Sequence, residues 1–326
     1  MEKLQMTGTD LTVTTIGLGS TQIGSGTDEA TSFAILDRYL AAGGSLIDTA
    51  HVYGADSSAD ESKSEATIGR WMADRGVRDR IVLTTKGGHP DNDFAHGIIG
   101  KPRLHAEELA HDLAMSLASL RTDVIDLYLM HRDDPGIPVG EILDFLEDQV
   151  KAGKIRYYGC SNWQIPRMQK AMAYAKAHGL TGFVANQVAG GLAKLDEEIT
   201  GRTDMVSLDP EMIRFHKENG MTVMSYMTMN NGYFQKRIQG KEIAPLIQMF
   251  YRDPVNEKIL AKLTEMHRQG ISLTSVMYHY AMHYGIPTIA LFGFSGVAQL
   301  EDLLAAIEQP VPEEDLAELY DIRWGV

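Results

Sequence analysis

Four titratable residues stand at or just beyond the ends of short apolar runs in the first half of the chain. Asp48 ends the first run of "LIDTAHVYG" and Tyr53 follows it, Lys86 ends "IVLTTK", and His131 ends "DLYLMH". A phenol is a weak acid near neutral pH, and a nearby ammonium favours the phenolate. Lys86 is the candidate for this ammonium and Asp48 for its counter-ion. The four residue types predict a relay that protonates an alkoxide through Tyr53.

The imidazole of His131 suits a second role in the same reaction. A neutral imidazole donates a hydrogen bond to a carbonyl oxygen and stabilises the negative charge that develops there. None of the four groups can supply a hydride, so carbonyl reduction by them implies a bound cofactor. Each residue taken alone also has an ordinary structural interpretation, as a helix cap, a core-edge tyrosine, a solvated lysine or a satisfied histidine. Four such groups at three consecutive strand ends favour function.

Short β-rich runs alternate along the chain with stretches of helical periodicity. The runs cover residues 14–19, 46–48, 81–86, 126–131, 155–161, 183–187, 222–227 and 288–293. Eight repeats of strand and helix predict an α/β fold, a (β/α)8 TIM barrel, whose active site lies at the carboxyl ends of the strands. "KLQM" and "LTV" around "TGTD" predict an N-terminal β-hairpin. We predict one domain over residues 1–326, with a doubly wound two-domain fold as the alternative.

Composition restricts the partners that the protein can have. The 30 Lys and Arg residues against 44 Asp and Glu residues give a net charge of −14, which disfavours nucleic acids and anionic membranes. The single cysteine, Cys160, excludes an internal disulfide and a multi-cysteine metal site. The chain shows no signal peptide and no apolar run near the ~20 residues of a membrane span. We expect a cytoplasmic protein with a small-molecule substrate, and no oligomeric state is predicted.

Several motifs resemble those of the aldo-keto reductase family in order and separation. They are "LIDTAHVYG", "TTKGG", "DVIDLYLMHRDDP", "GKIRYYGCSNW" and "VANQV", and the similarity covers nearly the whole chain. The resemblance implies a (β/α)8 barrel that interconverts carbonyl compounds and alcohols with NAD(P)H. It implies that Tyr53 is the general acid and base, that Lys86 and Asp48 activate it, and that His131 orients the substrate.

The same resemblance implies a nicotinamide site. Ser161, Asn162 and Gln187 would hold the carboxamide, and the nicotinamide ring would stack on Tyr226. The other cofactor contacts that the resemblance implies are Gly19, Ser20, Asp48, Met227, Thr228, Met229, Gly293, Ser295, Gln299 and Asp302. "GLGSTQIG" is not a Rossmann fingerprint, because Gln22 stands where the third glycine is required.

The chain departs from the family pattern after its last predicted strand, in "LFGFSGVAQLEDLL". Phe292 replaces a proline, Leu303 replaces an asparagine, and no Lys or Arg lies between Phe292 and Leu304. Basic side chains normally hold the 2′-phosphate of NADPH, so their loss predicts no strong preference for NADP over NAD. Lys236 or Arg237 would have to fold across to replace them. In "YMTMNNGYF" the usual Ser-Pro-Leu over the pyrophosphate is also changed.

Polar loops beyond the third and sixth predicted strands favour a polyhydroxylated substrate, a sugar or keto-sugar. The predicted substrate contacts are Gln22, Tyr53, Phe94, His131 and Trp163. Two other functions stay open. "HPDNDFAH", with His89, Asp91, Asp93 and His96, would suit a metal-dependent barrel hydrolase, although ligands from one loop disfavour it and we expect no metal. A non-catalytic nucleotide-binding sensor or regulatory subunit is disfavoured because all four catalytic candidates are present.

Overall fold

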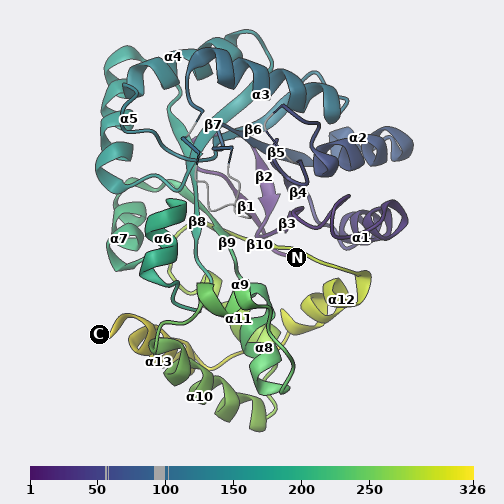
Figure 1. Cartoon of the computed structure of the whole chain (residues 1–326), viewed down its shortest axis with the longest axis vertical. Helices are drawn as coiled ribbons and strands as arrows, with labels where there is room; N and C mark the ends of the chain where they lie inside the picture. Colours follow the sequence, from purple (N-terminus) through teal and green to yellow (C-terminus); the bar gives the residue numbers. More distant parts are fainter. Residues whose placement is uncertain (56, 58, 92–99, 102) are drawn as a thin grey trace.

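The strands of this protein form a closed parallel barrel. The computed structural model describes residues 1–55, 57, 59–91, 100–101 and 103–326. In this part of the chain the barrel order is β3-β4-β5-β6-β7-β8-β9-β10, and β10 pairs back with β3 (Figure 1). The bounds are β3 Ile16–Gly19, β4 Leu46–Asp48, β5 Val82–Gly87, β6 Ile125–Met130, β7 Ile155–Ser161, β8 Phe183–Ala189, β9 Thr222–Tyr226 and β10 Thr288–Phe292. The predicted (β/α)8 barrel is confirmed.

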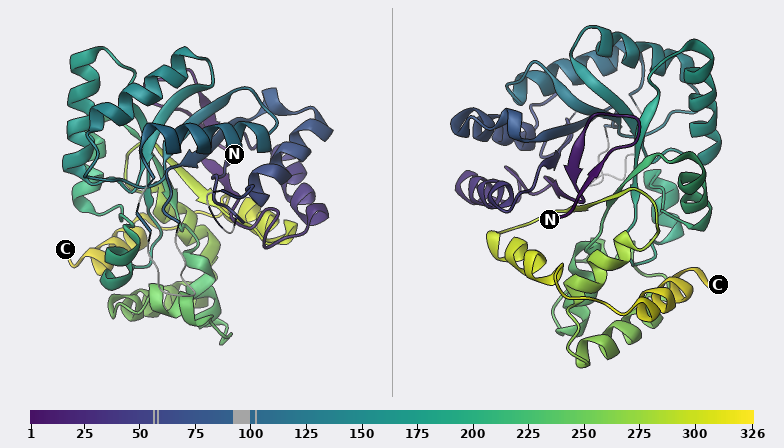
Figure 2. Two further views of the ribbon diagram at one scale, coloured as in Figure 1. Left: turned by 45° about the horizontal axis from the view of Figure 1, so that its top comes forward. Right: turned by 180° about the vertical axis from the view of Figure 1, so that it is seen from behind.

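Helices surround the barrel (Figures 1 and 2). The longer ones are α1 Glu29–Ala41, α2 Lys63–Arg75, α3 Ala106–Ser119, α4 Val139–Lys151, α5 Ile165–His178, α7 Pro210–Asn219, α10 Val255–Arg268, α11 Leu273–Met282, α12 Val297–Ala306 and α13 Glu313–Trp324. Short helical segments are η1 Arg78–Arg80, α6 Glu197–Thr203, η2 Asn230–Gly232, α8 Tyr233–Ile238 and α9 Pro245–Phe250. None of the helices in the described residues is long and apolar enough to cross a membrane.

Local sequence signals explain where several helices begin and end. The side chain of Ser62 accepts a hydrogen bond from the backbone N–H of Glu65 at the start of α2, and Gly76 ends this helix with φ +60°. Gly179 ends α5 in the same left-handed conformation, with φ +66°. Glycine adopts positive φ without a steric penalty. Each helix therefore stops where the chain must turn back toward the barrel.

The N-terminal hairpin closes the amino end of the barrel. Strand β1 (Lys3–Gln5) pairs antiparallel with β2 (Thr12–Thr14), which confirms the predicted hairpin. Met6, Leu11 and Val13 are buried in one apolar cluster with residues inside the barrel, among them Leu46 and Leu127. The view from behind shows the hairpin lying across the barrel (Figure 2). The carboxyl ends of the strands are left to hold polar and reactive groups.

The segment after β9 adopts an unusual backbone beside the barrel mouth. Met227, Asn230 and Asn231 have φ of +58°, +49° and +54°. These values are rare outside glycine and cost on the order of 1 kcal/mol or more for a residue such as methionine. Strain of this kind persists where surrounding structure imposes it, and such positions cluster at functional sites. The segment continues into α8 and α9 at the same end of the barrel (Figure 1).

Candidate active site

The structure brings the four predicted catalytic residues together at the carboxyl end of the barrel. The Nζ atom of Lys86 donates hydrogen bonds to Asp48 Oδ2 at 2.8 Å, to the carbonyl oxygen of Thr49 at 2.7 Å and to the hydroxyl oxygen of Tyr53 at 3.3 Å. Lys86 is fully buried and Asp48 nearly so. The side chains that the sequence placed at separate strand ends therefore form one hydrogen-bonded chain.

Electrostatics hold a cation beside the Tyr53 hydroxyl. Burial by itself lowers the pKa of Lys86, but the charges of Asp48 and Tyr53 and the hydrogen bonds to them outweigh it and raise this pKa above its usual value. Burial raises the pKa of the Asp48 carboxyl, and Lys86 opposes this rise. Gln187 Nε2 donates to Asp48 Oδ1 at 2.9 Å. The buried lysine therefore stays charged because its counter-ion is fixed in place.

His131 lies beside this chain as a neutral imidazole. Its ring centroid is 5.9 Å from that of Tyr53, in an edge-to-face arrangement. Burial, followed by the charges of His89 and Arg132, holds the pKa of His131 well below its usual range. The buried Nδ1 atom has no hydrogen-bond partner among the described residues. A neutral imidazole at this position can donate a hydrogen bond from its other nitrogen to a carbonyl oxygen.

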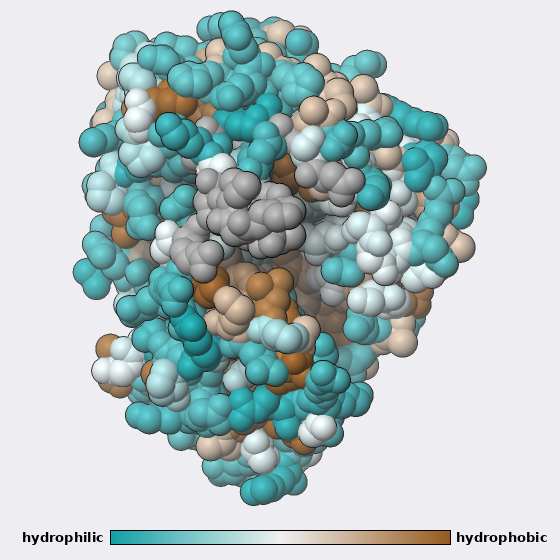
Figure 3. Space-filling view, viewed as in Figure 1, coloured by the Kyte–Doolittle hydropathy of each residue, from teal (hydrophilic) through white to brown (hydrophobic). Residues whose placement is uncertain are grey.

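A cleft of about 900 Å³ extends from the catalytic residues across the barrel mouth. Asp48, Tyr53 and Gln187 line it, and so do Asp302 and Leu303. Apolar side chains gather around the hollowed centre of this face (Figure 3). Volumes of this order are typical of sites for small molecules and cofactors. Asp48 and Tyr53 therefore open onto a space that is large enough for a substrate and a cofactor.

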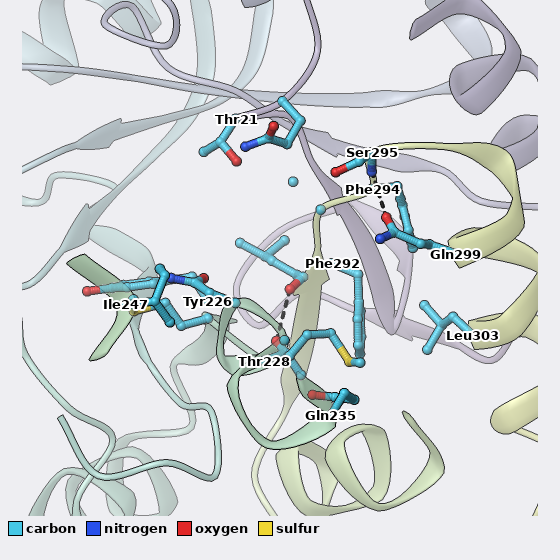
Figure 4. Close-up of a pocket in the computed structure, with 18 of the residues that line it drawn as sticks. Thr21, Tyr226, Thr228, Gln235, Ile247, Phe292, Phe294, Ser295, Gln299 and Leu303 are labelled. Carbon is cyan, nitrogen blue, oxygen red and sulfur yellow. Dashed lines mark hydrogen bonds between the residues drawn. The ribbon is translucent and has the colours of Figure 1, made fainter. Parts of the chain in front are cut away.

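Most of the predicted cofactor residues line this cleft. They are Gly19, Asp48, Gln187, Tyr226, Met227, Thr228, Met229, Gly293, Ser295, Gln299 and Asp302. Figure 4 shows Tyr226 on one side of the cleft, with Ser295 and Gln299 on the other. The Thr228 hydroxyl donates to the carbonyl oxygen of Leu291 at 2.9 Å, which ties the segment after β9 to β10 (Figure 4).

The predicted nicotinamide residues form a connected cluster at the ends of β7, β8 and β9. Asn162 Oδ1 accepts a hydrogen bond from the Tyr226 hydroxyl at 2.6 Å, and Asn162 Nδ2 donates to Ser161 Oγ at 2.9 Å. Ser161 Oγ donates to the carbonyl oxygen of Gln187 at 3.0 Å. The left-handed φ of +60° at Asn162 is one that asparagine tolerates. These bonds fix the orientation of the Tyr226 ring.

Several predicted contacts are buried and are not among the residues that line the cleft. Ser161, Asn162 and His131 belong to this group, and so do Trp163 and Ser20. Trp163 is fully buried, its Nε1 donates to the carbonyl oxygen of Arg132 at 3.2 Å, and its ring packs edge-on against Phe183. It is a core residue and does not line the cleft. Ser20 is also fully buried, and its hydroxyl accepts a hydrogen bond from Ser64 Oγ at 2.8 Å. The Ser20 side chain therefore forms its hydrogen bond within the protein.

Of two further predicted substrate contacts, Gln22 lines the cleft and Phe94 lies outside the described residues. Gln22 lines the cleft beside Thr21, which Figure 4 shows at its edge. Phe94 lies outside the described residues, as do Asp93 and His96 of the possible metal cluster. In the part of the chain that the structure describes, no group of three or more His, Cys, Asp or Glu residues could hold a metal ion.

A buried polar network behind the site was not predicted from the sequence. Asp112 on α3 accepts hydrogen bonds from the backbone N–H of Gly88 at 2.9 Å and from Arg103 at 2.8 Å. His51 Nε2 lies 3.6 Å from Asp112, and the backbone N–H of His51 donates to the carbonyl oxygen of Lys86. This network ties the loop that carries Tyr53 to β5 and α3. A single aspartate within a periodic helix gave no signal that it performs this task.

The sequence of this chain is similar to the sequences of known proteins. The Aldo/keto reductase family matches residues 15–323. "Uncharacterized oxidoreductase YrpG" from Bacillus subtilis is 29% identical over 331 residues, covering 100% of this chain and 97% of that protein. "Norsolorinic acid reductase stcV" from Emericella nidulans is 28% identical over 299 residues, covering 89% and 71%. "Aldo-keto reductase ausK" from the same organism is 28% identical over 319 residues, covering 93% and 74%.

Proposed function

From the premise that this chain belongs to the aldo-keto reductase family of oxidoreductases, we propose that it reduces an aldehyde or ketone to an alcohol with NAD(P)H. The observation that carries the proposal is the hydrogen-bonded chain from Asp48 through Lys86 to Tyr53, beside the neutral His131 and at one end of the cleft. This arrangement supplies a proton donor and a carbonyl-binding group at a single point, as carbonyl reduction requires.

The residues of the cleft fit a nicotinamide cofactor. When bound, NAD(P)H supplies the hydride. Tyr226 offers an aromatic face to the cleft. Its hydroxyl donates a hydrogen bond to Asn162 Oδ1 at 2.6 Å. Gln187, whose Nε2 donates a hydrogen bond to Asp48 at 2.9 Å, also lines the cleft. We propose that Ser161, Asn162 and Gln187 bind the carboxamide and that Tyr226 stacks on the ring.

Each catalytic residue then has a defined task. His131 donates a hydrogen bond to the carbonyl oxygen and orients it, and Tyr53 gives its proton to the same oxygen as negative charge develops there. Lys86 stabilises the phenolate form of Tyr53 that remains after the proton transfer, and Asp48 keeps Lys86 charged. In the direction of alcohol oxidation the phenolate of Tyr53 accepts the proton instead.

The proposal is tested with the purified protein, NADH or NADPH, and a panel of aldehydes and ketones. We expect the near-ultraviolet absorbance of the reduced nicotinamide to fall in the presence of a carbonyl substrate. Binding of either cofactor without turnover of any panel member would favour the non-catalytic nucleotide-binding alternative. Activity that a chelator abolishes, without consumption of a reduced nicotinamide, would favour the metal-dependent hydrolase.

We propose further that the site does not strongly prefer NADPH over NADH. No Lys or Arg lies between Phe292 and Leu304, and the carboxylate of Asp302, which accepts a hydrogen bond from Thr274 at 2.7 Å, lines this part of the cleft. A 2′-phosphate placed near Asp302 would lose hydration and gain no cationic partner there. A ribose 2′-hydroxyl would need only an acceptor or a water molecule.

The basic residues that follow β9 differ in whether they line the cleft. The guanidinium of Arg237 pairs with Glu257 at 2.8 Å and donates to the Tyr233 hydroxyl, and Arg237 is not among the residues that line the cleft. Lys236 and Lys241 do line the cleft. An amine that meets the pyrophosphate strengthens the binding of both cofactors equally, because both contain this group.

Dissociation constants of NADH and NADPH, measured by quenching of intrinsic fluorescence at one ionic strength, test this preference. We expect them to agree within about tenfold. Ser295→Arg should strengthen NADPH binding selectively, by the ~1.5–3 kcal/mol of a hydrogen bond to a charged group, and Ser295→Gln is the uncharged control. NADPH binding more than tenfold tighter in the unaltered protein, and lost in Lys236→Gln, would show that the phosphate site has moved to α8.

A further inference from the structure

A second imidazole lies directly beside His131. His89 follows the end of β5, and its ring centroid is 4.6 Å from that of His131 in an edge-to-face arrangement. The Tyr53 ring also lies edge-to-face with His131, at 5.9 Å. The side chain of His89 is partly exposed. Three rings that can form hydrogen bonds therefore meet where the substrate carbonyl is expected.

The contacts of His89 determine which of its nitrogens accepts a hydrogen bond. Nδ1 lies 2.7 Å from the carbonyl oxygen of Pro90, and a carbonyl oxygen only accepts, so Nδ1 must carry the proton. Burial, together with the charge of Arg132, lowers the pKa of His89 to about 4 against the opposing effects of Pro90 and Asp91. In a neutral ring protonated on Nδ1, Nε2 is an acceptor. None of the described residues forms a hydrogen bond with this Nε2.

We propose that Nε2 of His89 accepts a hydrogen bond from a hydroxyl group on the carbon next to the reacting carbonyl. Tyr53 and His131 both donate to the carbonyl oxygen, whereas His89 can only accept from the substrate. The ring centroids of His89 and His131 are 4.6 Å apart. At this separation each ring can form a hydrogen bond to one of two oxygens on neighbouring carbons. A substrate without this hydroxyl would leave Nε2 unpaired as water is displaced, which costs binding free energy.

This inference rests on the proposed carbonyl reduction and specifies its substrate class. The substrates that satisfy all three rings are α-hydroxyaldehydes and α-hydroxyketones. Sugars and keto-sugars contain this unit, so His89 provides a physical basis for the polyhydroxylated substrate that the sequence favoured. The role differs from that of the four catalytic residues, because His89 selects the substrate and transfers no proton in the reaction.

The test compares 2-hydroxypropanal with propanal, which differ by one hydroxyl group. We expect the unaltered protein to show the higher kcat/KM with 2-hydroxypropanal. His89→Leu removes the acceptor and should lower the ratio of the two kcat/KM values by about 5- to 100-fold. His89→Gln offers an amide oxygen in place of Nε2 and should restore part of the ratio. His178→Leu, an exposed histidine on α5, is the matched control and should leave the ratio unchanged.

The ratio separates this inference from general damage, because a disturbed His131 slows both substrates together. Turnover of both aldehydes with no preference for the hydroxylated one, or a ratio that His89→Leu leaves unchanged, would overturn the role of His89 while the proposed function stands. Failure of the unaltered protein to reduce either aldehyde or any other carbonyl compound would instead overturn the proposed function, and the role of His89 with it.

Discussion

Tyr53→Phe is expected to slow carbonyl reduction by ~10²–10⁴-fold or more, because the variant lacks the proton donor for the developing alkoxide. The change removes one hydroxyl, which accepts a hydrogen bond from Lys86 at 3.3 Å. Lys86 keeps its bonds to Asp48 and to the Thr49 carbonyl oxygen. The fold and the affinity for the cofactor should therefore be nearly unchanged. Steady-state kinetics with one carbonyl substrate, together with fluorescence titration of the cofactor, measure both effects.

A matched control for this variant is Tyr174→Phe. The Tyr174 hydroxyl donates to Asp144 at 2.9 Å on the exposed surface formed by α4 and α5, so its loss should leave turnover unchanged. Near-normal turnover of Tyr53→Phe, with Tyr174→Phe also active, would mean that another group donates the proton and that the assignment of Tyr53 is wrong.

The second large effect is expected for Lys86→Met. The Lys86 ammonium stabilises the phenolate of Tyr53 through a fixed charge in a buried site, and loss of one such group typically costs ~10²–10³-fold in turnover. The methionine side chain would occupy the same space without the charge or the hydrogen bond to the Tyr53 hydroxyl. Steady-state kinetics with one carbonyl substrate measure the loss of turnover.

Stability must be separated from catalysis in this variant. Lys86→Met leaves Asp48 buried without its cation, and loss of one partner of a buried ion pair commonly costs about 3–5 kcal/mol. The double variant Lys86→Met with Asp48→Asn removes both charges and should regain much of the thermal stability without regaining turnover. A single variant with full turnover would exclude the relay from Asp48 through Lys86 to Tyr53.

Much of the fold could be predicted from the sequence because its signals are local. β-rich apolar runs that alternate with helical periodicity predicted the barrel, and "TGTD" between two short apolar segments predicted the hairpin; both are observed. The placement of Asp48, Lys86 and His131 at strand ends also followed from local patterns. Parallel strands in a closed barrel bring all their carboxyl ends to one face, so residues far apart in the chain were expected to meet.

Tertiary packing decided which neighbours of these residues face the cleft. Trp163 and Tyr226 are both aromatic residues near strand ends, yet Trp163 is fully buried against Phe183 while Tyr226 lines the cleft. Asp112 reaches the site from α3, and His89 turns its ring toward His131. These arrangements depend on contacts between elements that are distant in sequence. Residue type and periodicity thus determined which groups this protein presents at its strand ends, whereas the packing of side chains between elements determined which of them meet.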